Sequence, residues 1–203
     1  MDAAASEVAL IDAGGANLGS VRYALERLGA TACIVRDADG LRGARRVILP
    51  GVGAAPQAMG LLRDRGLDQA LRAIQVPLLG VCLGMQLLFE VSEEGDVACL
   101  GLLRGRVRKL HPDPGIRVPH MGWNTLEPTC ATALLDGIGA GAQAYFVHGY
   151  AAAAGDDCIA TCDHGSRFAA VVQRGNICGT QFHPERSAAV GARLLGNFLR
   201  MSA

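Results

Sequence analysis

The sequence is poor in lysine and in aromatic residues. Lys109 is the only lysine among 19 basic residues, and aromatic residues make up 4% of the 203 positions. Schiff-base chemistry and Walker-type phosphate binding both need a lysine in a specific setting, so neither is expected. Because 19 acidic residues balance the 19 basic ones, the net charge is zero. The charge balance therefore gives no reason to expect a nucleic acid or an anionic membrane as partner.

The sequence also lacks the patterns that are typical of targeting segments and of disulfide frameworks. The first seven residues contain two acids and no apolar run after a basic start, so they do not resemble a signal peptide. No apolar stretch approaches the length of a membrane span. The seven cysteines are odd in number and do not have the spacing of a small disulfide scaffold. We therefore expect a cytoplasmic protein.

Half of the residues are hydrophobic, and in the first half of the chain they form short runs that alternate with helical spacing. Strands are predicted at residues 8–11, 33–35, 46–49 and 77–81. Helices are predicted at residues 17–28, 54–65, 67–75 and 83–89. This βαβ order predicts a parallel sheet with helices on both faces.

The second half contains more strands and tighter turns. Strands are predicted at residues 107–123, 142–150, 158–163, 169–174 and 176–182, followed by a closing helix at residues 187–201. There is no internal repeat, linker or low-complexity tract. We predict one α/β domain over residues 5–203, with a mostly parallel central sheet and extra mixed strands from the second half.

A cysteine stands at a predicted strand-to-helix corner, in Gly80-Val-Cys82-Leu-Gly84. Glycines two residues to either side relieve the crowding that a sharp nucleophile elbow creates. A thiol at this point would be activated by the start of the helix, and the N–H of Leu83 could point at a developing oxyanion. For the other cysteines, a role as small buried apolar residues is the better interpretation.

A nucleophilic cysteine needs a base and a group that orients the base. His183 follows a predicted strand, and Glu185 comes two residues later. The carboxyl ends of parallel strands meet at one edge of a sheet, so Cys82 and His183 could meet there. The loop Pro50-Gly-Val-Gly53 also follows a strand and could offer backbone N–H groups to an anion.

Together, these segments resemble the class I glutamine amidotransferases. The resemblance is carried by Pro50-Gly-Val-Gly53, Gly80-Val-Cys-Leu-Gly-Met-Gln86 and Gln181-Phe-His-Pro-Glu185. Two further stretches, Val118-Pro-His-Met-Gly-Trp-Asn124 and Tyr145-Phe-Val-His148-Gly-Tyr150, are similar to the glutaminase subunits of imidazole glycerol phosphate synthase. So is the segment from Ile11 to Val21. The resemblance implies the three-layer α/β fold of class I glutamine amidotransferases and covers nearly the whole chain.

The resemblance also implies roles for individual residues. Cys82 would attack the side-chain amide of L-glutamine, His183 would transfer the protons, and Glu185 would orient His183. The oxyanion and substrate-binding residues would be Gly51, Val52, Gly53, Leu83, Gln86, His148, Gly149 and Tyr150. The residues of the partner interface and gate would be Asn17, His120, Trp123, Tyr145 and Arg186. No metal and no cofactor is implied.

The implied partner is the (β/α)₈-barrel cyclase subunit of imidazole glycerol phosphate synthase, in a heterodimer. Ammonia released from glutamine would pass to this partner, which makes imidazole glycerol phosphate and an aminoimidazole carboxamide ribotide in histidine biosynthesis. The resemblance further implies that the oxyanion loop rearranges when the partner holds its substrate, so we expect little glutaminase activity from the isolated chain.

Five positions depart from the family's pattern: Ala13, Ala16, Ala55, Gly149 and Arg186. Arg186 stands where lysine is usual, and the two side chains differ in hydrogen-bond geometry. Ala16 and Arg186 fall in the implied gate and interface, and Gly149 falls among the implied glutamine contacts. None of the five is one of the three catalytic candidates.

Two other features have simpler interpretations than a binding site. Cys158, Cys162 and His164 could suggest zinc, but residues i and i+4 of a strand share one face and no second ligand pair is near in sequence, so two core cysteines are expected. Arg104, Arg106 and Arg108 alternate along a predicted strand and would share an exposed face. Phosphate or an acidic partner is the alternative for this arginine stripe.

Three other functions remain open at this point. The chain could serve a different synthase, it could sense glutamine without catalysis, or it could be a cysteine hydrolase or chaperone on a related sheet. The Met-Gly-Trp-Asn segment argues against the first, and the intact Cys82, His183 and Glu185 argue against the second. The third would not require Gln86 or a partner-facing segment.

Overall fold

The computed structural model describes residues 8–14, 17–112 and 114–202. Its largest element is a nine-stranded mixed sheet in the order β2-β1-β3-β4-β13-β12-β11-β8-β9. The strands of this sheet are β1 (Val8–Ile11), β2 (Ala32–Val35), β3 (Arg46–Gly51), β4 (Leu78–Cys82), β8 (His120–Pro128), β9 (Ala142–His148), β11 (Cys158–Asp163), β12 (Arg167–Arg174) and β13 (Ile177–Thr180).

The sheet is parallel from β2 to β13 and antiparallel from β13 to β9. The parallel strands are apolar on both faces; β1 and β4, for example, are buried along their whole length. This part consists of the four strands of the predicted βαβ region and of β13, and the antiparallel part comes from the second half of the chain. The α/β class with added mixed strands is thus confirmed.

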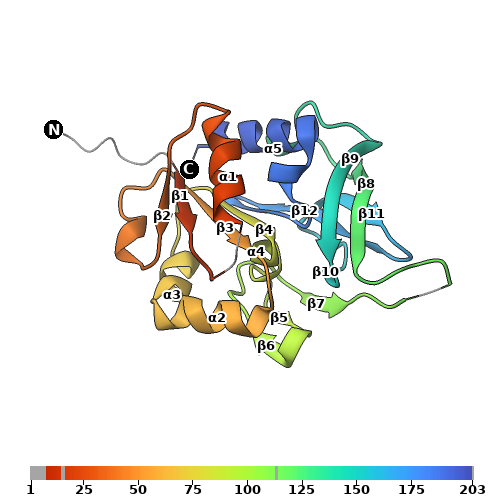
Figure 1. Ribbon diagram of the computed structural model, residues 1–203, viewed down its shortest axis with the longest axis horizontal. Helices are drawn as coiled ribbons and strands as arrows, with labels where there is room; N and C mark the ends of the chain where they lie inside the picture. The colour runs from red at the N-terminus through yellow and green to blue at the C-terminus, as the bar shows by residue number, and fades with distance from the viewer. Residues whose placement is uncertain (1–7, 15–16, 113, 203) are drawn as a thin grey trace.

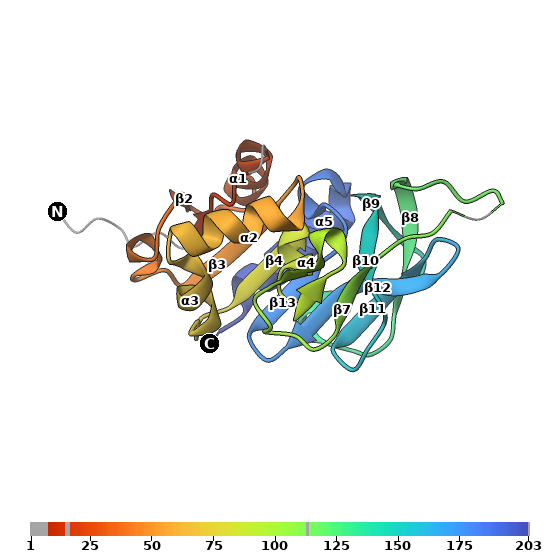
Figure 2. The same ribbon diagram turned by 90° about the horizontal axis from the view of Figure 1, so that it is seen from below.

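Helices cover both faces of the sheet, which gives three layers (Figure 1). One face carries α1 (Leu18–Glu26) and α5 (Ala188–Arg200), whose buried side chains join one apolar cluster. The other face carries α2 (Ala55–Asp64) and α3 (Leu67–Arg72), which join a second cluster. Figure 2 shows α2 and α3 in front of the sheet, beside the short helix α4 (Leu83–Gln86).

A second, four-stranded sheet lies next to α2 and α4 (Figure 2). Its order is β10-β7-β5-β6. The strands are β5 (Val91–Ser92), β6 (Val97–Ala98), β7 (Arg106–Lys109) and β10 (Tyr150–Ala152). Short 3₁₀ helices occur at Asp39–Leu41, Glu94–Asp96, Ala133–Leu135 and Pro184–Arg186. The sequence did not reveal β5 and β6, because two-residue strands have no measurable periodicity.

Several predicted elements were wrong in extent, and the helix predicted at 67–75, for example, ends at Arg72. The strand predicted at 107–123 is two strands, β7 and β8, in different sheets, since prolines 112, 114 and 119 provide no N–H to continue a ladder. The strand predicted at 142–150 divides at Gly149 into β9 and β10. The helix predicted at 83–89 ends at Gln86, and the carbonyls of Leu87 and Leu88 accept hydrogen bonds from the backbone of residues 100, 102 and 103.

No helix among these described residues is long and apolar enough to cross a membrane.

Candidate active site

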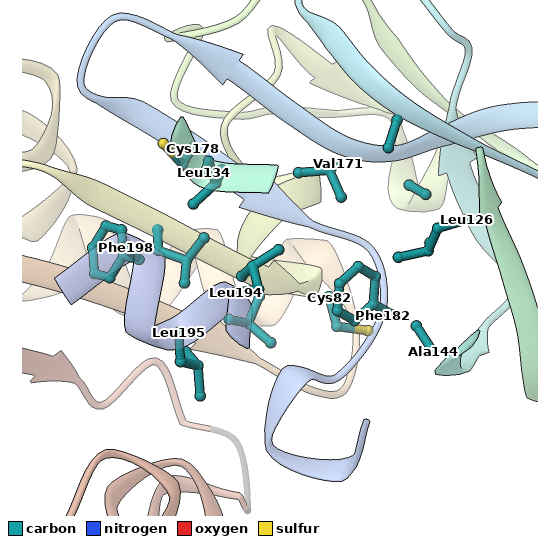
Figure 3. Close-up of a cluster of buried hydrophobic side chains, with 14 of the residues drawn as sticks. Cys82, Leu126, Leu134, Ala144, Val171, Cys178, Phe182, Leu194, Leu195 and Phe198 are labelled. Atoms are coloured by element: carbon teal, nitrogen blue, oxygen red, sulfur yellow. The ribbon is translucent and has the colours of Figure 1, made fainter. Parts of the chain in front are cut away.

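The candidate site lies where the parallel strands β3, β4 and β13 end. Gly51 at the end of β3 is paired in register with Cys82 at the end of β4. Two residues after β13, Phe182 packs beside Cys82 in the core (Figure 3), and His183 follows. The sheet edge therefore brings Gly51, Cys82 and His183 together, as the strand order predicts.

The backbone at Cys82 has the strained geometry of a nucleophile elbow. Its φ of 54° and ψ of −112° place a non-glycine residue in a region that side chains rarely adopt. The turn is so tight that a Cβ at Gly80 would lie 2.7 Å from the carbonyl oxygen of Gly84, and a Cβ at Gly84 would overlap the carbonyl oxygen of Leu49. The two flanking glycines are required for this physical reason.

His183 is buried and held by a carboxylate. Its Nδ1 lies 2.9 Å from Oε1 of Glu185, and the same oxygen accepts a 2.6 Å hydrogen bond from Nδ2 of Asn17. The backbone of His183 is fixed as well, because its N–H donates to the carbonyl of Tyr145 and its carbonyl accepts from the hydroxyl of Ser187. The ring thus has one defined orientation.

The electrostatics favour a protonated His183. Burial lowers its pKa, but interactions with the Cys82 thiol and the Glu185 carboxylate outweigh burial and raise the pKa of His183 to about 10. Its Nε2 is buried and has no hydrogen-bond partner of ordinary geometry among the residues that the structure describes. This nitrogen is available to a group bound beside Cys82.

Cys82 and His183 line one cavity of about 380 Å³. Nine further residues line it: Val52, Gly53, Leu83, Gln86, Glu94, Val147, His148, Gly149 and Tyr150. All but Glu94 and Val147 are in the predicted oxyanion and substrate set. Gly51, the remaining member of that set, lies in a neighbouring narrow cleft together with Asn17 and Glu185.

Glu94, Val147 and Gln181 contribute to the site, but the sequence predicted no role for them. Glu94 is one of four acidic residues between positions 90 and 96; it lines the cavity and accepts a 2.8 Å hydrogen bond from the N–H of Ala55. Gln181 is fully buried, and its Nε2 lies 3.8 Å from Sγ of Cys82. A polar side chain in an otherwise apolar strand end, before His183, was the available signal for Gln181.

The residues assigned to the partner interface fall into two groups. Trp123 is 52% exposed, and its ring lies 6.0 Å from that of Tyr145; Arg186 is exposed too. Asn17 is instead engaged with Glu185, as described above. His120 is buried on the inner side of β8, against Phe146, so in this structure it is not on the exposed surface with Trp123.

The two cysteines considered for zinc do not share a face. A bulge at Ala160 interrupts the register of β11 with β12, so Cys158 packs against one apolar cluster and Cys162 belongs to the other. Our expectation that they face the same way was wrong for this reason. Within the described ranges, no group of three or more His, Cys, Asp or Glu is arranged to hold a metal ion.

The arginine stripe is exposed but only partly in a strand. Arg106 and Arg108 lie on β7, with Arg106 paired to Asp96 at 3.1 Å, whereas Arg104 precedes the strand.

Of the departures from the family's pattern, Ala16 lies outside the described residues. A Cβ at Gly149 would contact nothing within 4 Å, so the position has room for a small side chain.

Comparisons with known proteins agree with this geometry. The family described as "Glutamine amidotransferase class-I" matches residues 9–201. Imidazole glycerol phosphate synthase subunit HisH of Xanthomonas euvesicatoria is 70% identical over 197 residues, which are 97% of this chain and 98% of that protein. The protein of the same name from Xylella fastidiosa (strain Temecula1) is 65% identical over 198 residues, covering 98% and 99%.

Solved structures share the fold at lower identity. A crystal structure of a glutamine amidotransferase superposes with a TM-score of 0.75 at 24% identity, covering 95% of this chain and 97% of the other. The structure of PurLQS from Thermotoga maritima gives a TM-score of 0.71 at 22% identity, covering 95% and 96%. The chain belongs to the class I glutamine amidotransferase family and, within it, to the HisH subunits of imidazole glycerol phosphate synthase.

Proposed function

We propose that this chain is a glutaminase that uses Cys82 as nucleophile and supplies ammonia to a cyclase subunit in histidine biosynthesis. The observation that carries the proposal is the placement of Cys82, at a strained elbow, in one cavity with His183, whose other ring nitrogen is held by Glu185. A base and an orienting carboxylate beside a thiol are the parts that covalent amide hydrolysis needs.

The reaction would proceed through a thioester. The Cys82 thiol gives its proton to His183, and its sulfur attacks the side-chain carbonyl carbon of glutamine. His183 then passes this proton to the departing nitrogen, so that the C–N bond breaks and ammonia leaves. The N–H groups of Leu83 and of the Gly51–Gly53 loop are the candidate donors to the oxyanion. Water then attacks the thioester carbon and gives a proton to His183, the C–S bond breaks, and glutamate leaves while His183 returns the proton to the Cys82 sulfur.

The cavity offers groups for the rest of the substrate. The carboxylate of Glu94 suits the α-ammonium group of glutamine, because opposite charges attract strongly in a partly enclosed cavity. Gln86 uses its Nε2 for hydrogen bonds to the Tyr150 carbonyl and to Gln181, which leaves its oxygen to accept from the substrate.

The partner is proposed to be the (β/α)₈-barrel cyclase, docked on the exposed face of β8 and β9. Met121 and Trp123 are 65% and 52% exposed there, and large exposed apolar side chains side by side are typical of interaction surfaces. The seven thiols are all free, which suits a reducing compartment such as the cytoplasm.

The deciding experiment is glutamine hydrolysis by the purified chain, with and without the cyclase and its nucleotide substrate. We expect strong stimulation in the complex and complete loss of activity in Cys82→Ser. Activity that ignores the cyclase but is lost in Cys82→Ser would point to another synthase. A chain that binds glutamine but never hydrolyses it, even in the complex, would be a glutamine sensor.

A further inference from the structure

A continuous chain of buried hydrogen bonds leads from the candidate nucleophile to the inner side of β8. It begins at Sγ of Cys82, which accepts from Nε2 of Gln181 at 3.8 Å. Oε1 of Gln181 accepts from Nε2 of Gln86 at 3.0 Å, and the same Nε2 donates to the carbonyl of Tyr150 at 2.8 Å. Gln181 is fully buried and Gln86 nearly so, so water does not compete for these groups.

The carbonyl of Tyr150 sets the direction of this chain. A carbonyl oxygen can only accept, so Gln86 must turn its nitrogen toward Tyr150 and toward Gln181. Gln181 must then receive this N–H on its oxygen, which leaves its own NH₂ group facing the sulfur. If either amide were turned over, an oxygen lone pair would face Cys82 or two acceptors would meet in a buried site.

A pair of histidines holds the carbonyl of Tyr150 from the other side. Nδ1 of His148 lies 2.8 Å from this oxygen and must carry the proton, for the same reason as Gln86. Nε2 of His148 therefore accepts from Nδ1 of His120, 3.1 Å away. Nε2 of His120 in turn accepts from the side-chain nitrogen of Asn124 at 3.2 Å, which makes every member of the chain consistent with neutral rings.

We propose that Gln181 is a positioning residue for the Cys82 sulfur, held by Gln86 and the Tyr150 carbonyl so that an N–H always faces the nucleophile. The inference rests on the proposed function, because it gives a role only if Cys82 attacks the substrate. The N–H stabilises negative charge on the sulfur and fixes its direction. Gln181 is not among the residues that line the cavity, so its proposed role is exerted through Cys82.

The test compares Gln181→Met with Thr180→Val, both in the full chain with the cyclase. Methionine keeps the length of the side chain but removes the N–H donor. Thr180 is the neighbouring, fully buried residue, and its hydroxyl donates to the carbonyl of Phe182, so Thr180→Val also removes one buried hydrogen bond but leaves the chain to Cys82 intact. The readouts are kcat, KM and the alkylation rate of Cys82 by iodoacetamide, located by peptide mass spectrometry.

We expect Gln181→Met to lower kcat and the alkylation rate of Cys82 about tenfold, with KM changed less than about twofold. Thr180→Val should match the wild type in all three. Equal kinetics in the two variants, or an unchanged alkylation rate in Gln181→Met, would overturn the inference. Cys82→Ser tests the proposed function separately from the role of Gln181. Glutaminase activity that survives Cys82→Ser would refute the proposed function, whatever the result for Gln181→Met.

Discussion

At the residue scale, the candidate site depends on a few hydrogen bonds that reach across long stretches of sequence. Glu185 is the clearest case. Its Oε1 accepts hydrogen bonds from the side chains of His183 and Asn17, while its Oε2 is buried without a hydrogen-bond partner among the described residues. Asn17 comes from the start of α1 and Glu185 from the 3₁₀ helix Pro184–Arg186, so these two elements meet at the carboxylate that holds His183.

Asn17 should therefore matter for catalysis as well as for any contact with a partner. We expect Asn17→Ala to lower kcat of the complex about three- to tenfold, because Glu185 loses a donor and holds His183 less firmly. Asn17→Asp should be worse, since it places a second carboxylate against Glu185. Steady-state glutamine hydrolysis measures both variants, and an Asn17→Asp enzyme as fast as the wild type would contradict this role.

At the scale of elements, the strand-to-helix corner at Cys82 works because backbone approaches backbone. Gly84, the second residue of α4, packs against the carbonyl of Leu49 in β3 without space for any side chain. β3 and β4 are paired up to Gly51 and Cys82, so this contact also sets the position of the Gly51–Gly53 loop relative to the thiol. The fold and the site therefore share the same close contact.

Two glycine-to-alanine changes should have opposite effects on stability. Gly84→Ala should lower the free energy of unfolding by more than about 3 kcal/mol, because its Cβ would displace a buried strand. Gly60→Ala, in the middle of α2 with nothing near the added Cβ, should raise it by roughly 0.5 kcal/mol through helix propensity. Urea unfolding followed by circular dichroism measures both; similar values for the two would show that the close contact is unimportant.

The pairing of β8 with β9 creates an acid-sensitive element. It places His120 directly opposite His148, and burial lowers the pKa of His120 to about 4 and that of His148 to about 3. Both groups take up protons more readily in the unfolded chain, where their pKa is near 6.5. Stability from the neutral pair is therefore complete above pH 6.5 and is lost as the pH falls toward 4.

A variant with one titrating ring fewer should lose less stability in acid. His120→Asn keeps a donor toward His148 but does not titrate. Between pH 6.5 and 5, each such histidine contributes a slope of up to about 1.4 kcal/mol per pH unit to the free energy of unfolding. Urea unfolding at pH 7.5 and at pH 5 should show a smaller drop for His120→Asn than for the wild type. Equal drops in the free energy of unfolding would show that the buried ring of His120 does not contribute to the acid sensitivity.

At the scale of the whole molecule, the two edges of the large sheet have different surroundings. β9 forms one edge, next to β8 with its exposed Met121 and Trp123, and β2 forms the other, with Ile34 38% exposed. Only the first edge adjoins the candidate site, since Tyr145 of β9 accepts the backbone N–H of His183. A partner on β8 and β9 would thus sit close to the base of the proposed reaction.

Trp123 should be a main contact for the cyclase. We expect Trp123→Ala to raise the Kd for the cyclase at least tenfold, because tryptophans at interfaces contribute a large share of the binding energy. Ile34→Ala, at the opposite edge, is the matched control and should leave the Kd unchanged. A titration followed by calorimetry measures both. Equal affinities for the wild type and Trp123→Ala would place the partner on another face.

Much of the fold could be predicted because its elements are local. The apolar strands and the amphipathic helices of the first half have clear periods, and the glycines around Cys82 identify a tight corner by themselves. The prediction of a single strand at 107–123 was wrong because a proline-rich segment within this range connects a strand of the small sheet to a strand of the large one. The prediction that Cys158 and Cys162 share a face was wrong because a bulge interrupts the alternation of side chains between the two faces of the strand.

The α/β class, the elbow at Cys82 and the candidate pair of His183 and Glu185 follow from local sequence patterns, because each depends on residues close together in the chain. Which distant groups meet is known only from the folded chain: Asn17 meets Glu185, Gln86 meets Gln181, Gln181 meets Cys82, Glu94 lines the cavity and His120 meets His148. Such contacts depend on sheet order and register, which bring together residues up to 168 positions apart and leave no local signal in the sequence.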